Sequence, residues 1–142
     1  MGETTDPDAL IRTLNRALPL LARDATAAAV AAGTMPGAEG VALAQRLREV
    51  AATELEDLER LAGRIAALGG SPAVTSKKLE PPAKASVMLE WLAGMQREAN
   101  DALVAAIPAD ADDAEGEATE HLLEHIIARK RDVIELFERA LR

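Results

Sequence analysis

Apolar residues recur along the chain at spacings of three, four and seven positions, which is the repeat of an α-helix with one buried face. Four segments carry this pattern, at about residues 7–32, 39–68, 82–107 and 113–141. The most regular stripe belongs to the second segment and consists of Leu43, Leu47, Val50, Leu58, Leu61, Ile65 and Leu68. The pattern therefore predicts an all-α protein of four helices.

Capping and turn residues mark the ends of these segments. Asp6 can cap the first helix, and Pro7 suits the first helical position because an N–H is not needed there. The break at residues 33–37 is short and rich in Gly and Pro, so the second helix should fold back antiparallel to the first. Pro108 and the acidic segment 110–113 separate the third helix from the fourth in a similar way.

The connection between the second and third helices is much longer. Residues 69–81 are rich in Gly, Pro, Ser and Lys and have no helical period. An extended segment of this length reaches about 40 Å, which matches a helix of roughly 27 residues. It can therefore run the full height of an antiparallel four-helix bundle and make the second and third helices parallel. A dimer of helical hairpins, or a bundle with a disordered connection, would fit the same pattern.

Size and composition fit such a bundle. The 142 residues are enough for one continuous core and too few for two, so residues 1–142 are expected to form a single domain. Aromatic residues make up only 1% of the chain. The core must therefore be built from Ala, Leu, Ile, Val and Met, a composition that favours helices over sheets.

Charge and cysteine content limit the possible partners. The net charge of −8 argues against nucleic acid and against an anionic membrane surface, both of which attract basic proteins. The absence of Cys excludes disulfides, thiolate metal sites and cysteine nucleophiles. The N-terminal segment lacks the basic and apolar regions of a signal peptide, and no apolar run is long enough to span a bilayer. A cytoplasmic protein is expected.

Five polar residues fall on or beside the apolar stripes, where charge is costly. Glu54 lies in the middle of the second stripe and Lys130 in the middle of the fourth, while Asp57 follows Glu54 by one turn. Asp24 and Gln96 flank the first and third stripes at mid-height. If the four helices pack as a bundle, these side chains form a central polar cluster.

The sequence around these positions resembles bacterioferritins and rubrerythrins of the ferritin-like superfamily. Residues 24–27 (Asp-Ala-Thr-Ala) resemble the first-helix stretch in which a metal-bridging Glu precedes Thr-Ala. Residues 54–57 and 64–72 resemble the Glu-x-x-His motif of the second helix and its Arg-Ile-x-x-Leu-x-Gly-x-Pro ending. The resemblance implies ferritin-like topology with the long crossover, and it places Gln96 where these families carry a Glu.

The metal site that the resemblance implies is incomplete in this sequence. A di-iron carboxylate centre uses four carboxylates and two imidazoles from facing helices. Asp24 and Glu54 could still be ligands, and Asp57 replaces one His with a carboxylate. Gln96 is a poor bridge between metals.

The fourth helix departs further from the family pattern. Ile127 and Lys130 stand at its Glu-x-x-His positions, so one side chain cannot ligate and the other brings a cation to the place where a metal would bind. Leu55 stands where bacterioferritins carry the haem-ligating Met. The sequence therefore predicts no cofactor.

We hypothesise that the Lys130 ammonium substitutes for the metal, paired with Glu54, Asp57 and Asp24, and that Gln96 completes the hydrogen bonds. The expected function is that of a degenerate ferritin-like bundle, a structural or protein-interaction module without catalytic residues. A protein partner is expected for such a module.

The alternative is a metal-binding ferritin-like oxidoreductase or iron-handling protein that holds iron or manganese on Asp24, Glu54 and Asp57. It needs a further donor such as Glu120 or His121, and the fourth helix would have to turn by more than 90° to supply it. His121 and His125 are spaced to chelate a metal, but both project from the polar face of their helix.

A homodimer is expected from the habits of the fold. Ala27, Ala29 and Ala31 lie outside the main stripe of the first helix and would allow another helix to approach closely.

Overall fold

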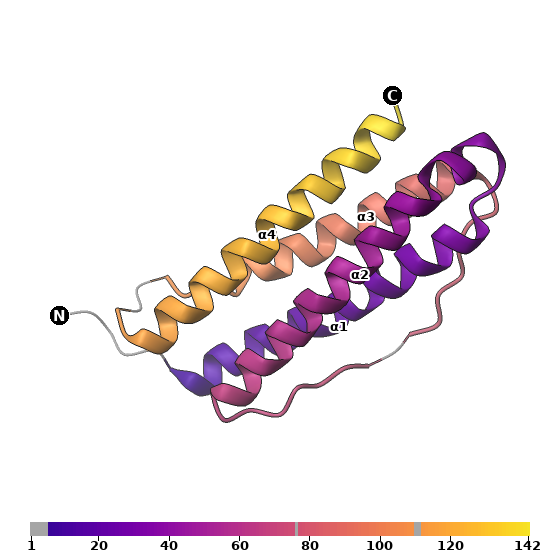
Figure 1. The fold of residues 1–142 in the computed structure, drawn as a ribbon. Helices are drawn as coiled ribbons and strands as arrows, with labels where there is room; N and C mark the ends of the chain where they lie inside the picture. Colours follow the sequence, from indigo (N-terminus) through magenta and orange to yellow (C-terminus); the bar gives the residue numbers. More distant parts are fainter. Residues whose placement is uncertain (1–5, 76, 110–111) are drawn as a thin grey trace.

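The computed structural model describes residues 6–75, 77–109 and 112–142. Its helices are α1 (Pro7–Thr34), α2 (Gly37–Ala67), α3 (Ala85–Ala105) and α4 (Ala114–Ala140) (Figure 1). The expected all-α bundle is confirmed. Of the expected features, the start of the N-terminal segment (residues 1–5) and part of the acidic boundary (residues 110–111) lie outside the described residues.

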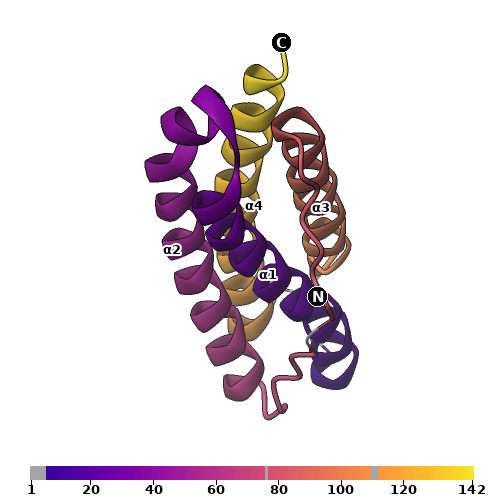
Figure 2. The ribbon, with the colours of Figure 1, turned by 90° about the vertical axis from the view of Figure 1, so that its right-hand side faces the viewer.

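The four helices pack as a ring. α1 contacts α2 and α3, and α4 contacts α3 and α2, so α1 and α4 occupy opposite corners (Figure 2). Short connections join α1 to α2 and α3 to α4 as antiparallel pairs. Between these pairs lies the crossover, whose described residues 68–75 and 77–84 run along the outside of the bundle between the end of α2 and the start of α3 (Figure 1). α2 and α3 are therefore parallel, as expected.

Acidic side chains cap the starts of α1 and α4, and a glycine follows the end of α2. The Asp6 carboxylate accepts hydrogen bonds from the backbone N–H groups of Asp8 and Ala9, and Asp113 accepts one from Gly116 at the start of α4. At the end of α2, Gly69 has φ +91°, a left-handed conformation in which Gly avoids the strain that a Cβ would cause.

The first part of the crossover is tied to α1. The side-chain amide of Asn15 donates to the carbonyl oxygen of Ser71 at 3.1 Å and accepts from the N–H of Ala73 at 2.9 Å. Gly70 fits against Ile11 so closely that a Cβ would stand 2.7 Å from the Ile11 side chain. Further along, Leu79 packs against the apolar core. The crossover is thus held along the bundle at several points.

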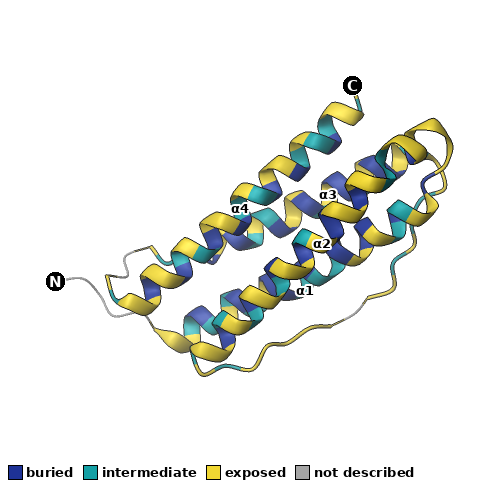
Figure 3. Ribbon diagram, viewed as in Figure 1, coloured by how far each residue is buried: buried dark blue, intermediate teal, exposed yellow. Residues whose placement is uncertain are grey.

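The buried residues lie along the helix sides that face the interior, and the exposed residues lie outward (Figure 3). The buried apolar residues form two clusters, one toward each end of the bundle. The first includes Ala28, Leu47, Leu92 and Phe137, and the second includes Leu14, Ile65, Leu103 and Ile126. Within the described residues, no helix has both the length and the apolarity needed to cross a membrane.

Two glycines of α2 give opposite predictions for stability. A Cβ at Gly40 would stand 1.8 Å from the Met35 carbonyl oxygen, so Gly40→Ala should separate α1 from α2 at their turn and cost about 1–3 kcal/mol. Gly63 has nothing within 4 Å of the added Cβ, so Gly63→Ala should stabilise the helix by about 0.5–1 kcal/mol. Urea denaturation followed by circular dichroism measures both changes. If Gly40→Ala were as stable as the wild type, the close approach at this turn would be disproved.

Candidate functional site

The polar residues that the stripes single out lie between the two apolar clusters, at mid-height of the bundle. We call them the polar layer: Asp24 of α1, Glu54 and Asp57 of α2, Gln96 of α3 and Lys130 of α4. None of the five is more than 2% exposed. Their burial follows from helical phase, because each lies one or two turns from core residues on the same face of its own helix.

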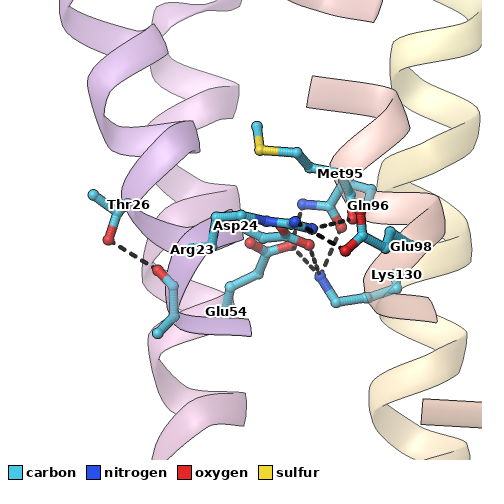
Figure 4. Close-up of polar contacts among 9 residues, drawn as sticks. Arg23, Asp24, Thr26, Glu54, Met95, Gln96, Glu98 and Lys130 are labelled. Atoms are coloured by element: carbon cyan, nitrogen blue, oxygen red, sulfur yellow. Dashed lines mark hydrogen bonds and ion pairs between the residues drawn. The ribbon is translucent and has the colours of Figure 1, made fainter. Parts of the chain in front are cut away.

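The ammonium group of Lys130 lies at the centre of the layer (Figure 4). Its Nζ donates to Asp24 Oδ2 at 2.8 Å, to Gln96 Oε1 at 2.9 Å and to Glu54 Oε1 at 3.2 Å. An ammonium has three N–H donors and no acceptor. All three are therefore used, each on an oxygen from a different helix.

Gln96 completes the network because its amide has both a donor and an acceptor. Since the ammonium can only donate, the amide oxygen of Gln96 must face Lys130, and its Nε2 then donates to Glu54 Oε1 at 2.6 Å. Both ends of the Gln96 amide are thus satisfied. A Glu at this position would bring another negative charge and could not donate.

Burial disfavours the ionised forms of Asp24 and Glu54, the two acids that contact Lys130. The low-polarity surroundings raise the pKa of Asp24 and of Glu54 above their ordinary values, although the charge of Lys130 opposes the shift in both. The nearby negative charge of Asp24 raises the pKa of Glu54 further. Among the described residues, Glu54 Oε2 has no hydrogen-bond partner, so this oxygen is held in the interior without compensation.

Asp57 has a different partner from the one expected. Its carboxylate is bound by the guanidinium of Arg129, whose Nε lies 3.0 Å from Oδ2 and whose terminal nitrogen contacts Oδ1. The expected pairing of Asp57 with Lys130 is wrong, because the longer and forked Arg129 side chain reaches Asp57 from the neighbouring position of α4. Its hydrogen bonds with Asp57 raise the pKa of Arg129.

Arg23 is a second cation that the stripes did not reveal. Its Nε donates to Asp24 Oδ1 at 3.1 Å, and its other nitrogens donate to the Met95 carbonyl oxygen at 2.8 Å and to Glu98 Oε1 at 3.3 Å (Figure 4). Arg23 and Arg129 each directly precede a buried residue of the layer and are themselves half-buried. Both reach inward from the flank of a helix, a position that a search for residues at the stripe centre misses.

The histidines of α4 lie away from the layer. His121 and His125 are both exposed, and their rings contact edge to face with centroids 4.7 Å apart. α4 keeps the phase that its apolar residues favour, with Lys130 and Ile126 inward. The rotation that would bring His121 to the acids is therefore not observed.

The model of the ferritin-like domain family matches residues 23–142, which is most of the chain. The protein belongs to the ferritin-like family. No curated protein matches it in sequence.

Solved structures of ferritin-like proteins have the same fold. A ferritin-like di-iron carboxylate protein from Bacillus anthracis gives a TM-score of 0.85 at 20% identity, covering 99% of this chain and 100% of its own. A dodecameric thioferritin related to bacterioferritin, from Bacteroides fragilis, gives 0.85 at 22% identity, covering 97% and 87%. Rhodobacter capsulatus bacterioferritin, described with a metal-free dinuclear site and haem iron, gives 0.75 at 20% identity, covering 98% and 86%.

The polar layer of this ferritin-like protein does not fit a di-iron centre. Two bridged cations need several carboxylates that face a shared space. Here the Lys130 ammonium lies between Asp24 and Glu54, Asp57 is bound by Arg129, and the third helix contributes a neutral amide. Within the described ranges, no three His, Asp or Glu side chains are grouped closely enough to hold a metal ion.

The raised pKa of Glu54 gives a pH-dependent prediction. In the unfolded chain Glu54 loses its proton near the ordinary Glu pKa of 4.5, whereas in the folded protein it keeps the proton to higher pH. The protonated Glu54 therefore stabilises the fold fully below pH 4.5. This contribution is lost as pH rises through the raised pKa. The free energy of unfolding of the wild type should therefore fall relative to that of Glu54→Gln as pH increases from about 4 to 7. Urea denaturation across this range measures the difference.

Glu59→Gln is the matched control, because Glu59 is an exposed carboxylate on the same helix. The free energy of unfolding of the wild type relative to that of Glu59→Gln should not fall as pH increases from about 4 to 7. A difference between wild type and Glu54→Gln that rises with pH would contradict a raised pKa.

Proposed function

We propose that this ferritin-like protein holds its centre together with side-chain cations in place of iron and acts as a structural or protein-interaction module rather than as an iron oxidoreductase. The observation that carries the proposal is the position of Lys130 Nζ, within 3.2 Å of an oxygen from each of the other three helices. The chain itself thus supplies a cation at the point where the helices meet.

The charge balance of the layer supports the proposal. Three carboxylates (Asp24, Glu54 and Asp57) contact three cationic side chains (Arg23, Lys130 and Arg129). Carboxylates attract divalent metals when their own charge is not already compensated. In this layer the compensation is built into the sequence, so we expect no resident cofactor.

One observation favours the alternative, an iron- or manganese-binding protein that uses Asp24, Glu54 and Asp57. Glu54 Oε2 is buried without a hydrogen-bond partner among the described residues and is free to accept one. Metal binding would further require Lys130 to leave two carboxylates and Asp57 to leave Arg129. These costs make the alternative the weaker of the two.

Removing the Lys130 charge tests the proposal. Lys130→Met keeps most of the side-chain volume but leaves Asp24 and Glu54 buried without their ammonium, which should cost about 3–5 kcal/mol at neutral pH. The loss should be smaller at acidic pH, where the carboxyls take up protons. Lys84→Met, which changes an exposed Lys, should stay within about 0.5 kcal/mol of the wild type. Chemical denaturation measures these changes.

Metal content gives the second half of this test. Wild-type protein incubated with ferrous or manganous ion and then desalted should retain no stoichiometric metal by elemental analysis, and it should not accelerate iron oxidation. Stoichiometric iron or manganese in the wild type would overturn the proposal, as would a Lys130→Met variant as stable as the wild type.

Self-association is part of the same proposal. Ala27 and Ala31, which were expected to face a second copy, are instead fully buried within the chain's own core, so they cannot form a contact between copies. Val41 and Leu55 of α2 are better candidates, because both are more than half exposed and their spacing of fourteen residues places them on one helix face. We propose a homodimer through this face of α2, in the cytoplasm and without nucleic acid or membrane.

Sedimentation velocity tests the association. The wild type should sediment as a dimer or larger species, consistent with the description of the related Bacteroides fragilis protein as a dodecamer. Leu55→Glu should weaken association about tenfold or more, because it buries a charge in the contact. Val104→Glu, at an exposed apolar residue of α3, is the control and should have little effect. A monomeric wild type at high concentration would disprove the proposed dimer.

A further inference from the structure

A cavity of about 640 Å³ opens on the outside of the bundle, between α1 and the middle of the crossover. Its lining residues belong to α1, the crossover and α3. None belongs to α2, the helix proposed for self-association, and neither Lys130 nor Glu54 is among them. Its volume lies within the range of about 300–1,000 Å³ that is typical of sites for small organic molecules. The crossover is tied to α1 by Asn15 on one side of the cavity and packs on the core through Leu79 on the other.

One part of the cavity wall is apolar. Pro19 and Leu20 of α1 contribute half-buried side chains, and Val74 and Leu79 line it from the crossover. Val74 is 53% exposed, so it presents apolar surface to water in the absence of a ligand. Covering such surface is favourable for any ligand with an apolar body.

The charged part of the wall is basic although the protein as a whole is acidic. Arg16, Arg23, Lys77 and Lys78 line the cavity against a single carboxylate, Glu98, in a chain of net charge −8. Arg23 is paired with Glu98 and Lys78 with Glu80. Arg16 and Lys77 form no ion pair with any described residue, so the cavity keeps two uncompensated cations.

Arg23 is held in a fixed orientation at the inner side of the cavity. Three of its five N–H groups are used, one each on Asp24, Met95 and Glu98. Its side chain is 21% exposed, and two N–H groups remain for a ligand. A guanidinium that is already positioned loses little conformational freedom when it binds an anion.

We propose that this cavity binds a small amphipathic anion, with its apolar body on Pro19, Leu20, Val74 and Leu79 and its carboxylate between Arg16, Lys77 and Arg23. The combination of an apolar wall with unpaired cations distinguishes this ligand class from a neutral apolar molecule and from a bare inorganic anion. The proposal does not rest on the function assigned to the polar layer, because the two residues that its test removes, Arg16 and Lys77, do not contact that layer.

Isothermal titration calorimetry with decanoate, used below its micelle concentration, tests the proposal. Decanoate should bind the wild type at one molecule per chain. Decanol, which has the same tail without the charge, and inorganic phosphate, which has charge without a tail, should each bind about tenfold more weakly or not at all.

Variants then locate the site. The double variant R16Q/K77Q should weaken decanoate binding about tenfold or more and leave the affinity for decanol unchanged, because it removes only the two unpaired cations. The matched control R60Q/K84Q has the same change in net charge at exposed residues outside the cavity and should bind decanoate as the wild type does. Both doubles should keep the helical circular dichroism spectrum and the sedimentation behaviour of the wild type.

Three outcomes would overturn the proposal: no saturable heat with decanoate, equal affinity of R16Q/K77Q and R60Q/K84Q for decanoate, or equal affinity of the wild type for decanol and decanoate. None of these outcomes would bear on the proposed function, which depends on the metal content and on Lys130→Met.

Discussion

The structure depends on one buried ammonium group. Moving a charge into the interior costs several kcal/mol unless its hydrogen bonds and its charge are both compensated. Lys130 Nζ meets this requirement because α1, α2 and α3 each present one oxygen at its height in the bundle. α1 and α4 occupy opposite corners of the ring, and the ion pair between Asp24 and Lys130 connects them across the centre. A slide or rotation of any one helix would break at least one hydrogen bond of this buried group.

We infer that the polar layer contributes more to register than to net stability. A well-packed apolar layer of the same volume would often be as stable, because desolvation offsets much of the attraction within a buried ion pair. The apolar clusters above and below the layer are rich in Ala and Leu. Among their described residues, Phe137 is the one buried aromatic side chain, and the half-buried Trp91 packs against the first cluster. Such a core can be packed in several registers at similar energy, so we infer that the layer is what selects one of them.

The sequence predicted the fold and the centre of the site because both follow from local periodicity. Helical phase placed Glu54 and Lys130 inward, and the length of the crossover predicted its path. The choice of partners was not predictable in this way. Whether Asp57 pairs with Lys130 or with Arg129 depends on side-chain reach and on the spacing between α2 and α4, which no single helix determines. Arg23 was missed for the same reason.

The cavity could not be predicted from the sequence because the crossover has no hydrophobic period from which burial can be inferred. The wall of the cavity forms where Asn15 and Leu79 fix the crossover to the bundle. Arg23 connects the cavity to the polar layer, since it lines the first and donates to Asp24 of the second. A carboxylate bound beside Arg23 would add negative charge near Asp24 and disfavour the ionised form of that acid. Through Arg23, occupancy of the proposed site would therefore be coupled to the charge of Asp24 at the centre of the bundle.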